Sequence, residues 1–290
     1  MTHAGFLSPF RPLGALERAR HLAEYRVHLR QSDGEVAFEA RQLTLREPRM
    51  RAIEAWSPRA GDASRADTGI LARRGEWLLA ATKANEGEAY GVEIELGRFA
   101  RRGGFPGFES PDLMLRVLMQ ESYHCRMLAQ LCRTAGVEFR SSLPAWPTRA
   151  FVAVIGAVPA ELRWAIVLAG ECVGASLFRR LHDALPECGF AAEEERRLRE
   201  LIREIWLDEV LHVAFLRASL SRAGLLISRG LLPLIAFGVF QQVPDLAALG
   251  CSARAILGDL RAGIPIPREL GWLRPDAPSD ELAALSPAVP

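Results

Sequence analysis

The chain has 290 residues, of which 49% are hydrophobic and 24% charged, a composition typical of a globular protein with a sizeable core. Its 36 Lys and Arg nearly balance its 35 Asp and Glu, so the net charge of +1 argues against a nucleic-acid partner. The amino-terminal residues lack the continuous apolar run of a secretory signal, and the five cysteines form no C-x-x-C motif. These features predict a protein of the reducing cytoplasm.

Apolar residues recur at helical spacing along nearly the whole chain, and no segment alternates as a strand does. We therefore expect an all-α fold. Residues 1–74 form the predicted lead-in, with one helix from Leu13 to Gln31 and another from Glu35 to Trp56. The polar, small-residue stretch "SPRAGDASRADTG" that follows is typical of a linker.

Four long amphipathic helices are predicted in residues 75–223. They run from Gly75 to Arg101, from Pro111 to Ala135, from Glu161 to Leu185 and from Ala192 to Ala223. Ser110 supplies an N-cap before the second helix, and Gly136, Pro186 and Gly224 supply stops after the second, third and fourth. Residues 141–161 are interpreted as a long crossover between the second helix and the third.

Residues 224–290 are expected to form an apolar helix and a proline-rich tail packed on the preceding helices. The longest apolar run, "GLLPLIAFGVF" at Gly230 to Phe240, has 11 residues and contains Pro233. A membrane span needs about 20 apolar residues, so the run predicts a buried helix or channel wall and no membrane association.

Two of the predicted helices carry the same pair of polar residues on their apolar face. Glu121 and His124 lie on this face in the second helix, and Glu209 and His212 lie on it in the fourth. The third helix carries a single acid there, Glu171. The apolar residues of these faces are Met114, Val117, Leu118, Leu128 and Leu131, then Trp164, Val167, Leu168 and Phe178, then Leu198, Ile202, Ile205, Leu216 and Leu220.

The first long helix offers several acids in "NEGEAYGVEIE". Glu88 shares a face with the apolar residues Trp77, Ala81 and Val92, so it is the acid expected to point inward, with Glu86 as the alternative.

Buried ionised carboxylates cost several kcal/mol each unless they are paired, hydrogen-bonded or bound to metal. Two metal ions would offset all of these negative charges together. Glu-x-x-His suits this role, because it places a carboxylate and an imidazole on the same side of one helical turn, where both can bind one metal. One Glu from each of two helices and one Glu-x-x-His from each of the other two is the ligand pattern of di-iron and di-manganese carboxylate bundles. The predicted ligands are Glu88 or Glu86, Glu121, His124, Glu171, Glu209 and His212. A metal-free helical scaffold with hydrogen-bonded polar residues is the alternative.

On these residues, the segment 75–223 resembles the ferritin-like di-iron carboxylate superfamily. The resemblance implies a ferritin-like four-helix bundle, here with additional N- and C-terminal helices. The sequence "DEVLH" is similar to the D-E-x-x-H on the last bundle helix of ribonucleotide reductase small subunits and bacterial multicomponent monooxygenases. The likeness implies that Asp208 supports a ligating histidine by a hydrogen bond.

The size of the chain is closer to the stand-alone oxygenases of that superfamily, such as the p-aminobenzoate N-oxygenase group, aldehyde-deformylating oxygenase and the tRNA-modifying hydroxylase. The N-oxygenase group has an additional histidine one turn before its last Glu-x-x-His. Ile205 stands at the matching position of this chain, which is a departure from that group.

The resemblance implies two iron ions, with manganese as an alternative for one or both, and O₂ as co-substrate. The expected reaction is hydroxylation, N-oxygenation or desaturation of a small organic substrate, with no catalytic residue beyond the metal ligands. No flavin, nicotinamide or iron–sulfur motif is visible, so electrons are expected from a ferredoxin or reductase partner. A homodimer is compatible with the sequence.

A ferroxidase that handles iron, as ferritin does, is the alternative function. The flanking residues 1–74 and 224–290 favour a covered substrate pocket over a storage protein. His182 is interpreted as a helix-end histidine and not as a ligand. Tyr90 and Tyr123 are interpreted as packed residues, with a redox role as the alternative.

Overall fold

The computed structural model describes residues 5–44, 68–84, 90–92, 94–95, 111–137 and 146–274, and these are mostly helical, as expected for an all-α fold. The helices are α1 (Ala15–Gln31), α2 (Asp33–Thr44), α3 (Thr68–Ala84), α5 (Pro111–Thr134), α6 (Trp146–Ala157), α7 (Ala160–Ala184), α8 (Ala192–Ser219), α9 (Arg222–Gln242) and α10 (Ala253–Ala262). Three 3₁₀ helices, η1 (Leu185–Cys188), η2 (Pro244–Ala247) and η3 (Arg268–Leu273), and two short strands, β1 (Phe6–Leu7) and β2 (Ile264–Pro265), complete the described elements.

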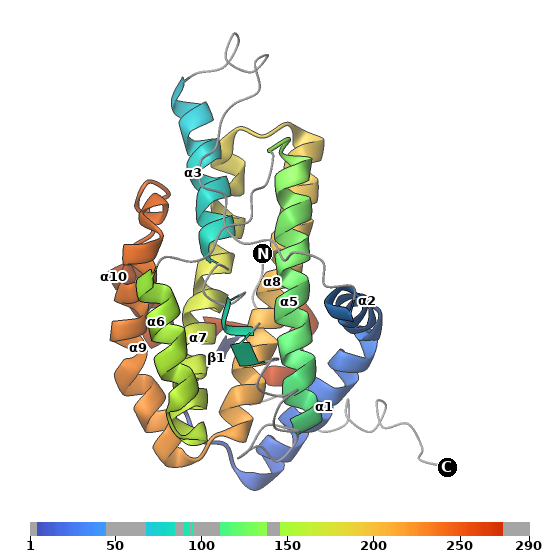
Figure 1. Cartoon of the computed structure of the whole chain (residues 1–290), viewed down its shortest axis with the longest axis vertical. Helices are drawn as coiled ribbons and strands as arrows, with labels where there is room; N and C mark the ends of the chain where they lie inside the picture. The colour runs from blue at the N-terminus through green and yellow to red at the C-terminus, as the bar shows by residue number, and fades with distance from the viewer. Residues whose placement is uncertain are drawn as a thin grey trace.

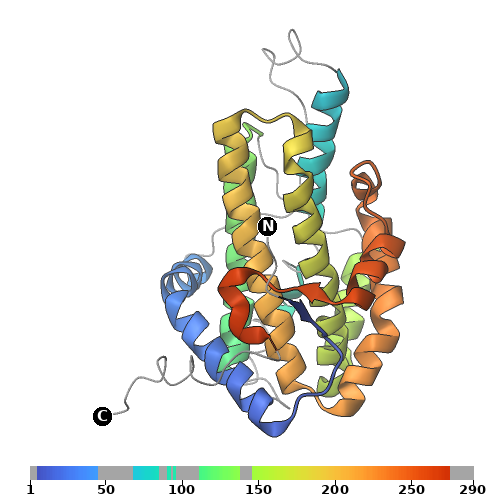
Figure 2. The ribbon, with the colours of Figure 1, turned by 180° about the vertical axis from the view of Figure 1, so that it is seen from behind.

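The long helices α5, α7 and α8 run along the length of the molecule (Figure 1). Helices α1 and α2 lie on one flank, while α6, α9 and α10 lie on the other, as both views show (Figure 2). Helix α7 packs against both α8 and α9, and α5 packs against α8 and α2. The apolar faces predicted from helical spacing are mostly buried in this arrangement, including Met114, Leu168 and Ile202.

Two helix boundaries agree closely with the sequence. Helix α5 begins at Pro111 and ends at Thr134, and Gly136 beyond it adopts a positive φ of 70°. This left-handed conformation favours glycine, and it lets the amide of Val137 reach back to the carbonyl of Cys132 at 2.8 Å. Helix α7 ends at Ala184, before Pro186.

The predicted end of the fourth helix is wrong. Helix α8 stops at Ser219, and Gly224 lies inside α9 instead of ending the preceding helix. Ser221 caps α9, since its hydroxyl accepts a hydrogen bond from the amide of Gly224 at 3.1 Å. A Cβ at Gly224 would overlap the present position of the Glu161 carboxylate, which also accepts a hydrogen bond from the Ser221 amide, so a larger residue would have to displace that side chain.

Two further predictions need correction. The crossover at 141–161 contains the helix α6, which the sequence reading missed. The first long helix begins at Thr68, inside the predicted linker, and is described as α3 only to Ala84; residues 90–92 and 94–95 are helical as well. The remainder of the predicted second lead-in helix, from residue 45 on, lies outside the described residues.

The apolar run Gly230–Phe240 is part of the 21-residue helix α9, which is long and apolar enough to cross a membrane by length and composition. Only 28% of its most apolar window is buried, so the prediction of a buried helix is wrong for its outer face. Its inner face packs on α7. The length argument against a membrane span no longer holds, and the absence of membrane association stays a prediction.

The two ends of the described chain are tied together. Strands β1 and β2 pair antiparallel, with Leu7 opposite Ile264. The ring of His21 on α1 meets that of Trp272 in η3 edge-on at 5.9 Å. The cysteines are a separate matter: all five are buried and none forms a disulfide, among them Cys172 and Cys251. Helix α1 packs on α8, and α9, α10 and β2 pack on α7. The rest of the predicted tail, from residue 275 on, lies outside the described residues.

Candidate metal centre

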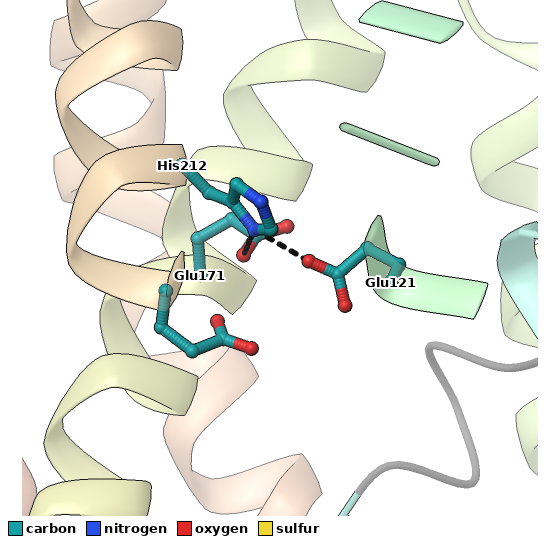
Figure 3. A group of neighbouring side chains, drawn as sticks. Glu121, Glu171 and His212 are labelled. Carbon is teal, nitrogen blue, oxygen red and sulfur yellow. Dashed lines mark ion pairs between the residues drawn. The ribbon is translucent and has the colours of Figure 1, made fainter. Parts of the chain in front are cut away.

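Four of the predicted ligands converge in the interior. Glu121 comes from α5, Glu171 from α7, and Glu209 and His212 from α8; each offers a ligand atom within 4.8 Å of the others. Figure 3 shows the side chains of Glu121, Glu171 and His212 directed toward one another from separate helices. All four are buried, so this group could hold a metal ion shielded from solvent.

His124 completes the cluster, and Glu121 lies between the two imidazoles. Its Oε1 is 2.5 Å from Nδ1 of His212, and its Oε2 is 3.3 Å from Nδ1 of His124. Glu171 Oε2 lies 3.5 Å from the same atom of His212, and Glu209 Oε1 lies 3.7 Å from Nδ1 of His124. The cluster therefore divides into two groups, each with one imidazole and one carboxylate of its own, which share Glu121.

A second set of side chains holds the outer nitrogens of the imidazoles. Asp208 Oδ2 lies 3.1 Å from Nε2 of His124, and its Oδ1 lies 2.9 Å from Nε2 of His28. Gln120 Oε1 lies 3.2 Å from Nε2 of His212 and also accepts a hydrogen bond from Tyr25 at 3.4 Å. Both imidazoles are thus oriented with Nδ1 facing the carboxylates and Nε2 facing a partner, the arrangement that supporting hydrogen bonds impose on metal-binding histidines.

Three of these supporting residues were not predicted. Tyr25 and His28 come from α1, and Gln120 precedes Glu121 on α5. The sequence carried a weak signal, since His21, Tyr25 and His28 recur at helical spacing on one face of the predicted first helix. Asp208, by contrast, was predicted to support a ligating histidine, and the structure places it beside the histidine of the other motif, His124.

The electrostatics of the cluster follow from burial and mutual proximity. Burial alone would raise the pKa of the Glu121 carboxyl, but His212 and His124 outweigh it and lower the pKa to about 2. Burial alone would lower the pKa of His124, but Glu121 and Asp208 raise it to about 10. The pKa of His212 is raised for the same reason by Glu121 and Glu171, against the effect of burial. In the absence of a cation, protonated imidazoles act as counter-ions, and a metal ion would replace their protons.

The chemistry of the residues fits a bound metal cation. Both carboxylate oxygens of Glu121, Oε2 of Glu171 and Nδ1 of both histidines are buried, and within the described part of the chain none makes a geometrically satisfactory hydrogen bond. With neutral imidazoles, the three carboxylates would leave a buried charge of −3, which is costly unless cations balance it. Carboxylate oxygens with one imidazole per metal suit iron or manganese.

The remaining candidates lie elsewhere. Glu88 and its alternative Glu86 fall outside the described residues. His182 lies in the last turn of α7, as predicted, with its ring centroid 6.1 Å from that of Trp206. Tyr123 meets Phe38 edge-on, as expected of a packed tyrosine. Tyr90 is half-buried in the helical residues 90–92.

An apolar cavity of about 480 Å³ adjoins the cluster. Glu121 and Glu171 both form part of its wall, and other lining residues come from α3, α5, α6, α7 and α9 and include Gly91, Val92 and Glu95. Its volume falls within the range of small-molecule sites, roughly 300–1,000 Å³. The cavity therefore connects the interior carboxylates with space for an organic molecule, and α9 forms part of its wall.

Comparison with protein-family models, with curated proteins and with solved structures finds no match to this chain.

Proposed function

We propose that this protein is a di-iron oxidoreductase that uses O₂ to oxidise an organic substrate. The observation that carries the proposal is the contact between the cavity and the cluster: Glu121 and Glu171 belong to both. A centre that only handled iron would not need an apolar cavity of this size beside its carboxylates.

The proposal gives each part of the chain a role. Glu121, Glu171, Glu209, His124 and His212 hold the two metal ions, with the first-helix glutamate as a further ligand. Two ferrous ions would supply a binding place and electrons for O₂. Asp208 and Gln120 keep the imidazoles turned toward the cluster, and the apolar wall excludes water from the reacting substrate.

In a hydroxylation, one oxygen atom of O₂ enters a C–H bond and the other leaves as water. The balance requires two electrons and two protons, which an external donor must provide, and a ferredoxin or reductase is the proposed source. N-oxygenation and desaturation stay alternatives for the same site. The proposal also includes a ferritin-like bundle formed by α3 with residues 90–92 and 94–95, α5, α7 and α8.

Aerobic titration with Fe(II) tests this function against iron handling. Without a reductant, the proposed oxidoreductase should oxidise about two Fe(II) per chain and then stop, because the centre is then filled with iron that nothing reduces or removes. A ferroxidase would keep oxidising added Fe(II) and would elute from a size-exclusion column as a large assembly. Continued oxidation far beyond two equivalents would overturn the proposal in favour of iron handling.

A further inference from the structure

The cavity beside the cluster extends from the interior to the surface of the molecule. Its inner wall includes the buried carboxylates Glu121 and Glu171. Its outer wall includes Phe151 of α6 and Leu234 of α9, whose exposed fractions are 42% and 67%. Within the described residues, a molecule that reaches the cluster through this cavity thus passes between α6 and α9, which flank the same side of the molecule (Figure 1).

Hydrocarbon surface dominates the wall along this path. Helices α5, α6, α7 and α9 all contribute aliphatic or aromatic side chains to it, among them Val117, Phe151, Val167, Phe178, Ile235 and Val239. Such a wall stabilises a bound molecule by removing its apolar surface from water, and it gives a charged group no compensation for lost hydration.

The charged residues of the described wall, apart from the two cluster carboxylates, are already paired. Lys83 Nζ lies 2.8 Å from a carboxylate oxygen of Asp245. Arg163 lies 3.4 Å from Glu95 Oε2, and its guanidinium also donates to carbonyls at the end of α6, including that of Gly156 at 3.2 Å. The guanidinium is therefore committed to closing α6, and neither cation is left to bind a carboxylate or phosphate on a substrate.

From these three observations we propose that the cavity binds a neutral, mostly hydrocarbon substrate, with its reacting end against Glu121 and Glu171. The polar side chains of Thr148 and Gln242 in the wall suit an uncharged hydroxyl, carbonyl or amide on the substrate. This inference rests on the proposed function for its statement of which end reacts, but the binding preference is independent of the metal.

Two glycines of α9 supply a matched pair of variants. A Cβ at Gly238 or at Gly230 meets no atom within 4 Å, and only Gly238 lines the cavity. Gly238→Phe should place its ring in the cavity, whereas Gly230→Phe changes the same helix at a position outside the wall. Gly170→Leu fills the cavity from α7 next to the cluster, since a Cβ there also meets open space.

The experiment measures displacement of the neutral fluorescent dye Nile red by 1-decanol and by decanoate at pH 8, where decanoate is ionised. The neutral alcohol should displace the dye at a concentration at least about tenfold lower than the carboxylate. Gly238→Phe and Gly170→Leu should each weaken dye binding at least about tenfold, while Gly230→Phe should bind like the unmodified protein. Thermal melting of each variant establishes that it is folded.

Equal or stronger displacement by decanoate would overturn the inference, and so would full dye binding in both filled variants. Iron content measured on the same samples separates the two proposals. Preference for decanol in a protein that binds no iron would contradict the proposed function and support the proposed substrate class. Two irons per chain with a preference for decanoate would do the reverse.

Discussion

At the scale of single residues, the two Glu-x-x-His motifs do not act as separate units. Glu121 approaches the imidazole of its own motif and, more closely, that of His212 on another helix. Asp208, next to Glu209 in the chain, likewise supports His124 of the other motif. Because each motif contributes to the surroundings of both histidines, a change in one residue should affect the whole centre.

Asp208→Asn tests the supporting role of this carboxylate. The substitution keeps the side-chain size but removes the negative charge that holds Nε2 of His124 at 3.1 Å. We expect the affinity for Fe(II) to fall by roughly 10- to 100-fold, measured by competition with a chromophoric chelator. Glu204→Gln, an exposed acid one turn earlier on α8, is the control. Equal affinity in Asp208→Asn and the control would contradict this role.

His21 predicts a pH dependence of stability that is independent of the metal centre. Burial, followed by the charge of Arg217, lowers its pKa from 6.5 to about 4. Between these pH values the unfolded chain therefore binds up to one more proton than the folded protein. The contribution of His21 to the free energy of unfolding is fully present above pH 6.5 and is lost as the pH falls toward 4. The loss is at most about 3 kcal/mol at 1.36 kcal/mol per pKa unit.

His21→Phe should remove this component while keeping the ring contact with Trp272. Urea unfolding at pH 7.5, 5.5 and 4.5 gives the comparison, since the other titrating groups are common to both proteins. The difference in unfolding free energy between variant and unmodified protein should shift in favour of the variant as the pH falls. A difference that is constant with pH would show that His21 does not titrate in this range.

At the scale of elements, the helices that could be predicted from the sequence are those with a strong apolar periodicity and with Pro or Gly at their ends. Helix α5 has a proline at its first position and a glycine beyond its end, and both local signals agree with the packing. The junction of α8 and α9 was misjudged because Gly224 was interpreted as a stop. In the structure its missing side chain makes room for Glu161 of α7, a contact between residues about 60 positions apart that local patterns do not contain.

Gly224→Ala tests that contact. A Cβ would displace the Glu161 carboxylate, which lies 3.2 Å from the Ser221 amide at the start of α9. We expect a loss of about 1–2 kcal/mol in unfolding free energy from the broken hydrogen bonds. Gly230→Ala on the same helix meets open space and should stabilise the protein by about 0.5–1 kcal/mol.

The double variant Gly224→Ala with Glu161→Ala should be less destabilised than the sum of the two single variants, since the clash and the hydrogen bonds involve the same carboxylate. Strict additivity would argue that Gly224 is needed for another reason. Both chemical and thermal unfolding can provide these values.

Helix α6 shows another limit of reading elements from sequence. Pro147 and the surrounding glycine and prolines favoured a crossover, yet a proline in the first turn of a helix removes no hydrogen bond. More of the candidate site than of the surrounding fold could be predicted from the sequence. Its polar residues stand out because each lies on an otherwise apolar helical face: Glu121, His124, Glu171, Glu209 and His212. Tyr25, His28 and Gln120 were missed since their roles depend on how α1 packs on α8.

At the scale of the whole molecule, the flanking segments enclose the long helices. Helices α1 and α2 cover one flank and α6, α9 and α10 the other (Figure 2). The first flank supplies Tyr25 and His28 to the support of the imidazoles, and the second supplies the outer wall of the cavity. The additional residues on either side of the long helices are thus part of the site.

Metal loading should stabilise the whole protein, because the cluster forms only when α5, α7 and α8 are assembled. Binding to the folded state alone contributes about 2.7 kcal/mol at a free metal concentration 100 times the dissociation constant. The melting temperature should therefore rise on anaerobic addition of Fe(II), and it should do so in the Glu204→Gln control as well. No rise in either protein would argue against a preformed centre.

The central claim, a two-metal centre shared between two Glu-x-x-His motifs, is tested most directly by the iron content of anaerobically loaded and desalted protein. We expect about two irons per chain for the unmodified protein and for Glu204→Gln, and a loss of at least one iron in Glu209→Gln and in His212→Gln. Iron well below one per chain in the unmodified protein, or unchanged content in both ligand variants, would contradict it.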